Sequence, residues 1–241
     1  MPLLVAVAVA AGAALQSATG FGFSVIAAPL VFAAVGPEEA VGLLIVLGTL
    51  VNVLTLVSEG RRPQPVVRES AVILAGSVPG AIAGVAVLRA LDAVALQIAV
   101  SVGVVATLLA RRVAAGRDLP GWMAMPAGVV AGALSTSTTT AGPPVILYLL
   151  GRDIAPARVR DTMPVVFLGL SVVSVIALWV TGTTGAVPDA TLVAILVPVV
   201  VAGHLAGRPL FARLERSGKY ETVLTVALLV AVTAGLATAL L

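Results

Sequence analysis

The chain has 241 residues, of which 60% are hydrophobic and only 10% are charged, and its formal net charge is +3. Soluble domains carry about 25% charged residues, so this composition excludes an ordinary soluble protein and indicates a polytopic protein of the lipid bilayer. The absence of cysteine excludes disulfides, thiolate nucleophiles and cysteine-ligated metal. The basic residues lie in short loops between apolar segments, so we expect no nucleic-acid partner.

Apolar segments follow one another through two halves of a single membrane domain, residues 1–118 and 119–241. The segments cover residues 3–15, 24–35, 40–57, 66–88 and 93–110, and then 122–134, 143–150, 162–181, 190–207 and 221–241. The last three of each half are about long enough to cross a hydrocarbon core of roughly 30 Å, whereas the first two are too short. We predict an all-α fold in which each half has a broken helix or half-helix hairpin, over 3–35 and 122–150, followed by three transmembrane helices.

The two broken segments are copies of each other. Residues 12–26 read GAALQSATGFGFSVI, and residues 132–146 read GALSTSTTTAGPPVI. Each copy places a break rich in glycine and hydroxyl groups inside an apolar stretch. Backbone exposed by such a break persists at membrane depth only where it faces protein or a water-filled cavity, as is typical of transporters.

The fourth segment of each half carries a matching pair of glycines. Gly80 and Gly84 in the first half correspond to Gly203 and Gly207 in the second. Small residues four positions apart let helices approach closely within lipid. We therefore expect these glycines to pack helices together rather than to handle substrate.

Loop charges predict the orientation of the chain, because Lys and Arg collect in cytoplasmic loops. If each broken segment reverses the chain, every basic residue except Arg89 falls on the cytoplasmic side. Each half then has an odd number of membrane elements, so the second half is inserted upside down relative to the first. We predict two inverted repeats, with both termini on the extracytoplasmic side.

Glycine and proline motifs follow both breaks. The first break reads Gly20-Phe21-Gly22-Phe23 with Pro29 downstream, and residues 36–41 read GPEEAV. The second break continues as GPPV from residue 142 into YLLGR at residues 148–152. In these motifs the chain resembles the sulfite exporter TauE/SafE family of bacterial membrane proteins, over essentially its whole length. The resemblance implies a multi-pass transporter of the bacterial inner (cytoplasmic) membrane that exports sulfite, sulfoacetate or related sulfur-containing anions.

The residues of the breaks independently favour a site for a small anion. Half-helices that enter from opposite faces bring their N-termini to the midplane, where free N–H groups and a partial positive charge attract oxyanions. Glycines let the backbone approach a ligand, and hydroxyls and amides add donors. None of the 11 acidic residues lies in either copy of the break, where a cation site would need one. The candidate substrate-binding residues are Gln16, Ser17, Thr19, Gly20, Gly22, Asn52, Ser135, Ser137, Thr138, Thr139 and Gly142.

These candidates have a structural alternative, because Ser and Thr in membrane helices often bond to the carbonyl one turn back. Asn52 has one too, in a hydrogen bond between helices. His204, the only histidine, titrates near neutral pH and would suit proton coupling, although a packed histidine is the alternative. Arg160 either forms a cytoplasmic gate or anchors the topology.

We therefore predict a secondary transporter that works by alternating access, with no cofactor and no metal. The sequence has no P-loop, so we expect an ion gradient rather than ATP to drive it. The expected partners are a small anionic substrate, the bilayer and a coupling ion, H+ or Na+; the oligomeric state is left open. A membrane-embedded Ser/His hydrolase is one alternative, although the chain has no G-x-S-x-G elbow. An anion channel is the other.

Overall fold

A computed structural model describes most of the chain, namely residues 2–58, 62–92, 94–96, 98–99, 102, 119–152, 154–217 and 226. These residues are 85% helix with no strand, so the all-α prediction is confirmed over this part of the chain. The segments expected at 93–110 and 221–241 lie largely outside the described residues.

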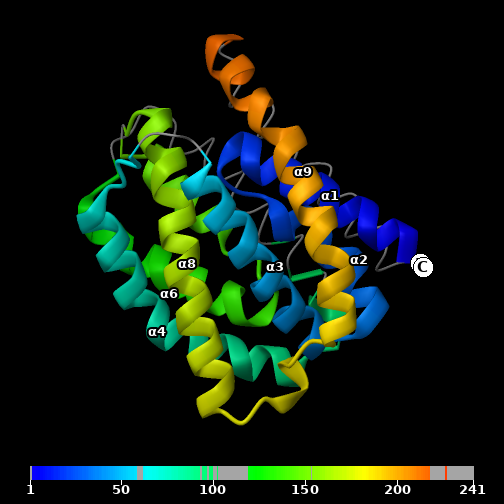
Figure 1. The fold of residues 1–241 in the computed structure, drawn as a ribbon. Helices are drawn as coiled ribbons and strands as arrows, with labels where there is room; N and C mark the ends of the chain where they lie inside the picture. The colour runs from blue at the N-terminus through cyan, green and yellow to red at the C-terminus, as the bar shows by residue number, and fades with distance from the viewer. Residues whose placement is uncertain are drawn as a thin grey trace.

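Helices follow one another through both halves (Figure 1). Their bounds are α1 Pro2–Thr19, α2 Phe23–Val35, α3 Pro37–Val57, α4 Val67–Ala90, the 3-10 turn η1 Gly121–Met123, α6 Ala124–Ser137, α7 Gly142–Leu150, α8 Pro156–Val180, the 3-10 turn η2 Thr184–Ala186, and α9 Ala190–Ser217. Four described helices, α3, α4, α8 and α9, are long and apolar enough to cross a membrane. Pro37 and Pro156 begin α3 and α8, where the N–H that proline lacks would have no helical partner.

Left-handed backbone conformations occur at both helix breaks. Between α1 and α2, Gly20 and Gly22 have φ of +88° and +108°, values that residues with a side chain rarely adopt. Between α6 and α7, Thr139 has φ of +58°, which is unusual for a β-branched residue. The resulting α6 and α7 have only 14 and 9 residues. At 1.5 Å per residue, neither reaches across a core of about 30 Å.

The two halves interlock through their fourth helices, α4 and α9. Helix α4 lies along α6, and α9 lies along α1, so each fourth helix packs on the broken helix of the other half. A Cβ on Gly80 would collide with the backbone carbonyl of Val129, and a Cβ on Gly203 would collide with that of Ala10. Bare backbones are therefore in direct contact at both pairs, and the predicted packing role of these glycines is confirmed.

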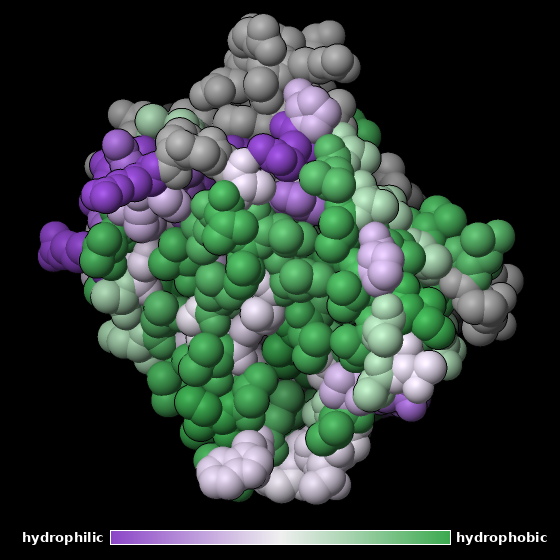
Figure 2. Space-filling view, viewed as in Figure 1, coloured by the Kyte–Doolittle hydropathy of each residue, from purple (hydrophilic) through white to green (hydrophobic). Residues whose placement is uncertain are grey.

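The surface of the helices suits a lipid environment. Figure 2 shows hydrophobic side chains over the middle of the visible face and hydrophilic ones gathered at its upper end. Trp179 and Leu3 are more than three quarters exposed, at 81% and 76%. The start of α8 and the end of α9 lie at the hydrophilic end, while the α8–α9 connection lies at the opposite end (Figure 1). We name the hydrophilic end the arginine-rich end, defined by Arg152, Arg158, Arg160 and Arg208.

The glycine contact between α4 and α6 gives a stability prediction. Gly80→Ala is expected to lower the melting temperature of the purified protein by at least several degrees, because overpacking costs about 1–3 kcal/mol even where side chains can adjust. Here the obstacle is the Val129 backbone, which cannot rotate away. Gly48→Ala is the matched control, since its Cβ would lie 3.5 Å from the Phe23 ring, an ordinary contact. Equal melting temperatures for the two variants would contradict the packing described here.

Candidate functional site

A cavity of about 50 Å³ lies where the two breaks meet. An added Cβ on Gly142, at the second break, would lie 2.8 Å from Phe21 Cδ2 in the first break. The cavity is bounded by both breaks and by α3 and α8, and its lining residues are Gln16, Gly22, Phe23, Ser24, Val25, Leu44, Ile45, Gly48, Asn52, Ser135, Thr139, Thr140, Ala141, Gly142, Phe167, Leu170 and Ser171.

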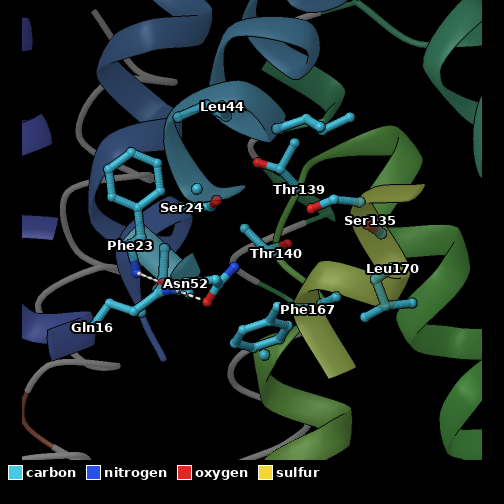
Figure 3. Close-up of a pocket in the computed structure, with 17 residues that line it drawn as sticks. Gln16, Phe23, Ser24, Leu44, Asn52, Ser135, Thr139, Thr140, Phe167 and Leu170 are labelled. Carbon is cyan, nitrogen blue, oxygen red and sulfur yellow. Dashed lines mark hydrogen bonds between the residues drawn. The ribbon is translucent and has the colours of Figure 1, made fainter. Parts of the chain in front are cut away.

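Several residues predicted from the sequence lie together in this lining. They are Gln16, Gly22, Asn52, Ser135, Thr139 and Gly142. In Figure 3, Gln16 and Asn52 lie on one side of the pocket, and Ser135 and Thr139 lie on the other. The two copies of the break thus contribute to one site together with α3.

The remaining predicted hydroxyls bond to backbone carbonyls. Thr19 Oγ1 donates to the Leu15 carbonyl at 2.9 Å, and Ser137 Oγ donates to the Ala133 carbonyl at 2.7 Å. Thr138 Oγ1 is 3.0 Å from the Leu134 carbonyl. These are bonds to the preceding helical turn, the structural alternative raised above. Gly20 packs instead against the backbone of Arg160.

Gln16 and Asn52 form a hydrogen-bonded pair that joins three helices. Gln16 Nε2 donates to Asn52 Oδ1 at 2.6 Å, and Gln16 Oε1 accepts from the Phe23 N–H at 3.1 Å. This pair ties the end of α1 to the start of α2 and to the middle of α3. Because the Asn52 oxygen is the acceptor, its amide nitrogen is left with two N–H donors beside the cavity.

Hydroxyl groups supply most of the remaining polar lining. Ser135 Oγ is 2.8 Å from Ser174 Oγ, and Thr140 Oγ1 is 2.7 Å from Thr138 Oγ1. Ser24, Thr140 and Ser171 also line the cavity, and they were not among the residues predicted from the sequence. Ser24 and Thr140 lie inside the two copies of the break, so the duplicated sequence could have indicated them as lining residues. Ser171 lies in the apolar middle of α8, outside the duplicated break, and no pattern in the sequence indicated it.

The two half-helix N-termini at the cavity differ in what they can donate. The first turn of α2 presents the N–H groups of Ser24 and Val25, for which a helix has no carbonyl of its own. At the start of α7, Pro143 and Pro144 have no N–H to give. We expected both helix ends to donate alike, but the proline pair leaves α7 with fewer N–H groups than α2. Backbone donation at the site therefore comes chiefly from α2.

The lining of the cavity combines polar and apolar side chains and is uncharged. It has no Asp, Glu, Lys, Arg or His side chain among the described residues. Within the same part of the chain, no group of three or more His, Asp or Glu side chains could hold a metal ion. The electrostatics of the cavity are therefore set by N–H and O–H dipoles, together with the positive end of α2.

His204 and Arg160 lie outside the cavity lining and contact the end of α1. His204 Nδ1 is 2.6 Å from Ser17 Oγ, and Arg160 Nη2 donates to the Ser17 carbonyl at 3.0 Å. The Ser17–His204 pair bears on the hydrolase alternative. The other ring nitrogen of His204 meets the hydroxyl of Ser58 at 3.1 Å rather than a carboxylate, and Ser17 is fully buried away from the cavity. The pair therefore lacks both the orienting acid and the substrate access of a Ser-His-Asp site.

An all-helical, apolar fold with a small, partly polar cavity at two helix breaks is typical of a membrane protein of the transporter class. A family model described as sulfite exporter TauE/SafE matches residues 4–236. The chain belongs to this family, and the resemblance seen in its motifs is confirmed. Comparisons with curated proteins and with solved structures gave no match.

Proposed function

We propose that this protein is a secondary transporter that moves small oxyanions, with sulfite as the preferred substrate, out of the cytoplasm of a bacterial cell. The substrate site is the cavity between the two breaks. The observation that carries the proposal is the lining, which joins both copies of the duplicated break and offers N–H and O–H donors without a carboxylate. Membership of a sulfite exporter family supports the same conclusion.

The donors of the lining favour an anion over a cation. The amide nitrogen of Asn52, the Ser24 and Val25 N–H groups at the start of α2, and the hydroxyls of Ser24 and Ser171 lie in the lining. The hydroxyls of Thr139 and Thr140 donate instead to Thr138. A cation site would instead need carboxylates or several free carbonyl oxygens. Preorganised donors and the positive end of a helix are the usual means of binding an oxyanion.

The size of the cavity favours the smallest members of the substrate class. A cavity of about 50 Å³ has room for a small group of atoms and is more than a single water needs. Sulfite, with one sulfur and three oxygens, matches this volume. Sulfoacetate has twice as many non-hydrogen atoms and would require the cavity to widen, so we expect it to bind more weakly.

Alternating access fits the duplicated architecture. In the proposed mechanism the two repeats are inverted, and the site at their junction opens in turn to each face of the membrane. The arginine-rich end faces the cytoplasm by the positive-inside rule, which leaves the termini outside. The inside-negative potential favours anion exit by about 2.3 kcal/mol per charge at 100 mV, and a coupling ion, H+ or Na+, that enters the cell in exchange for the anion adds to that outward drive.

Binding of four anions to the purified protein tests the proposal. Sulfite is expected to bind most tightly, followed by sulfate and sulfoacetate, with acetate weakest. Replacing the cavity residue Asn52 with Leu is expected to weaken sulfite binding about tenfold or more, because a hydrogen bond to a charged group contributes about 1.5–3 kcal/mol. The control is Thr49→Leu on the same helix, since Thr49 is not part of the lining.

Three outcomes would contradict the proposal. Absence of sulfite binding would remove the site, and equal binding by the two leucine variants would place it elsewhere. Currents across planar bilayers far above carrier turnover would instead favour the anion channel.

A further inference from the structure

Two of the five hydroxyl side chains in the cavity lining are not used within the protein. They belong to Ser24 and Ser171, which are partly exposed and have no hydrogen-bond partner within the described part of the chain. The other three are already bonded, Ser135 to Ser174, and both Thr139 and Thr140 to Thr138. The hydroxyls of Ser24 and Ser171 are therefore available to a ligand.

The free hydroxyl of Ser171 is unusual for its position in a helix. Ser24 lies in the first turn of α2, directly after the break, so it has no regular helical turn behind it. Ser171 lies in the middle of α8, where the Phe167 carbonyl is one turn back. Thr162 and Thr181, near the two ends of α8, do bond to the carbonyl one turn back, at 2.6 and 2.7 Å. Ser171 departs from this common arrangement and lines the cavity instead.

Ser171 occupies in the second half the position that Asn52 occupies in the first. Each lies the same number of residues after the proline that begins its helix, in α8 and in α3 respectively. One turn earlier, Gly48 and Phe167 correspond in the same way, and both also line the cavity. The two walls of the cavity are therefore built by equivalent turns of α3 and α8.

The second half offers an anion little besides Ser171. Pro143 and Pro144 remove two N–H groups from the first turn of α7. Among the described residues of this half, Ser171 is the lining side chain whose donor has no protein partner. The first half contributes the amide N–H groups of Asn52 from the opposite wall. Figure 3 shows Asn52 and Leu170, the residue before Ser171, on opposite sides of the pocket.

We propose that Ser171 is the residue through which the second half binds the substrate anion, so that the anion is held between Ser171 on α8 and Asn52 on α3. This inference rests on the proposed function, because it takes the cavity to be the anion site. An oxyanion has several acceptor oxygens and accepts from both walls at once. Helix α3 packs on α8, and the cavity has only about 50 Å³, so a small anion reaches both. Bound sulfite thereby ties the two halves together.

Titration calorimetry of sulfite with the purified protein tests the role of Ser171. Ser171→Ala is expected to weaken binding about tenfold or more, because a hydrogen bond to a charged group is lost. It is not expected to lower the melting temperature without sulfite, since this hydroxyl has no protein partner to lose. Ser77→Ala is the matched control and is expected to leave binding unchanged. It removes the same atom from a fully buried serine of α4 that lies outside the lining and bonds to the Leu74 carbonyl at 2.7 Å.

Stabilisation by sulfite supplies a second measurement, because a ligand of the folded state raises the melting temperature. At one sulfite concentration, the rise is expected to be the same for wild type and Ser77→Ala and smaller for Ser171→Ala. Weaker binding by Asn52→Leu with unchanged binding by Ser171→Ala would overturn this inference and leave the proposed function standing. An equal loss of binding in Ser77→Ala would also overturn it. If the wild-type protein binds no sulfite, the proposed function fails and this inference fails with it.

Discussion

Asn52→Asp is expected to abolish sulfite transport and leave the protein folded. The substitution is nearly isosteric, and one carboxylate oxygen can still accept the hydrogen bond from Gln16 Nε2, which measures 2.6 Å in the native pair. The group that faces the cavity changes, because a carboxylate oxygen with negative charge replaces the amide NH2 group and its two N–H donors. Two like charges 4 Å apart repel by about 4 kcal/mol at an effective dielectric constant near 20. Together with the lost donor bond, this predicts a fall in transport of roughly a thousandfold or more.

Sulfite flux from proteoliposomes measures this effect, and the melting temperature shows whether the variant is folded. Transport is expected to recover partly in acidic buffer, where the new carboxyl binds a proton and becomes a donor again. Asn52→Leu removes the donors without adding charge, and we expect it to retain more transport than Asn52→Asp at neutral pH. Full transport activity of the Asn52→Asp variant at neutral pH would show that the substrate does not contact residue 52.

The positions of the helix breaks could be predicted because their cause is local. Gly20 and Gly22 adopt left-handed conformations that interrupt a helix, and the duplicate at 132–146 marked the matching position in the second half. Hydropathy also located the long membrane helices, since lipid requires a long apolar run. It did not locate the end of α9, which runs to Ser217, ten residues beyond the apolar segment that ends at 207. Hydropathy reports contact with lipid, and a helix can continue past the membrane surface.

The candidate site was only partly visible in the sequence. Ser17 and Ser135 look alike there, yet Ser135 lines the cavity and Ser17 turns toward His204. Which side a residue faces depends on the rotation of its helix, and helices that are apolar all round carry no periodic signal for it. Ser171 on α8 was missed for the same reason. The contact between Arg160 and Ser17 joins residues 143 positions apart, so no local pattern could indicate it.

The pairing of helices between the halves was also beyond the sequence. The spacing of Gly80 and Gly84 predicted close packing, but any small-residue surface would complement it equally well. Only the folded chain shows that α4 packs on α6 and that α9 packs on α1. Each broken helix therefore packs against a long helix of the opposite half. This packing brings the two breaks together at one cavity.

Gly142→Leu is the second substitution for which we expect near-complete loss of sulfite transport, and Phe21→Ala is expected to restore part of it. Even a Cβ at Gly142 would lie 2.8 Å from Phe21 Cδ2 and 3.7 Å from Phe167 Cζ. A leucine side chain has four carbons, about as many non-hydrogen atoms as sulfite, so it would fill a cavity of about 50 Å³ and exclude the substrate. Removing the Phe21 ring returns space at the same point, and residues in contact show non-additive effects in a double-mutant cycle.

Flux from proteoliposomes is compared for wild type, both single variants and the double variant. Phe21→Ala alone is expected to destabilise the protein by about 3–5 kcal/mol, as loss of a buried phenylalanine generally does, and therefore to lower transport as well. The decisive comparison is the double variant against Gly142→Leu, since two independent defects would multiply, whereas a shared contact lets one relieve the other. Val31→Ala in place of Phe21→Ala is the control, because Val31 is fully buried in α2 but does not line the cavity. Rescue by Phe21→Ala alone would show that the two breaks meet at the transport path, and equal or absent rescue by both would show that they do not.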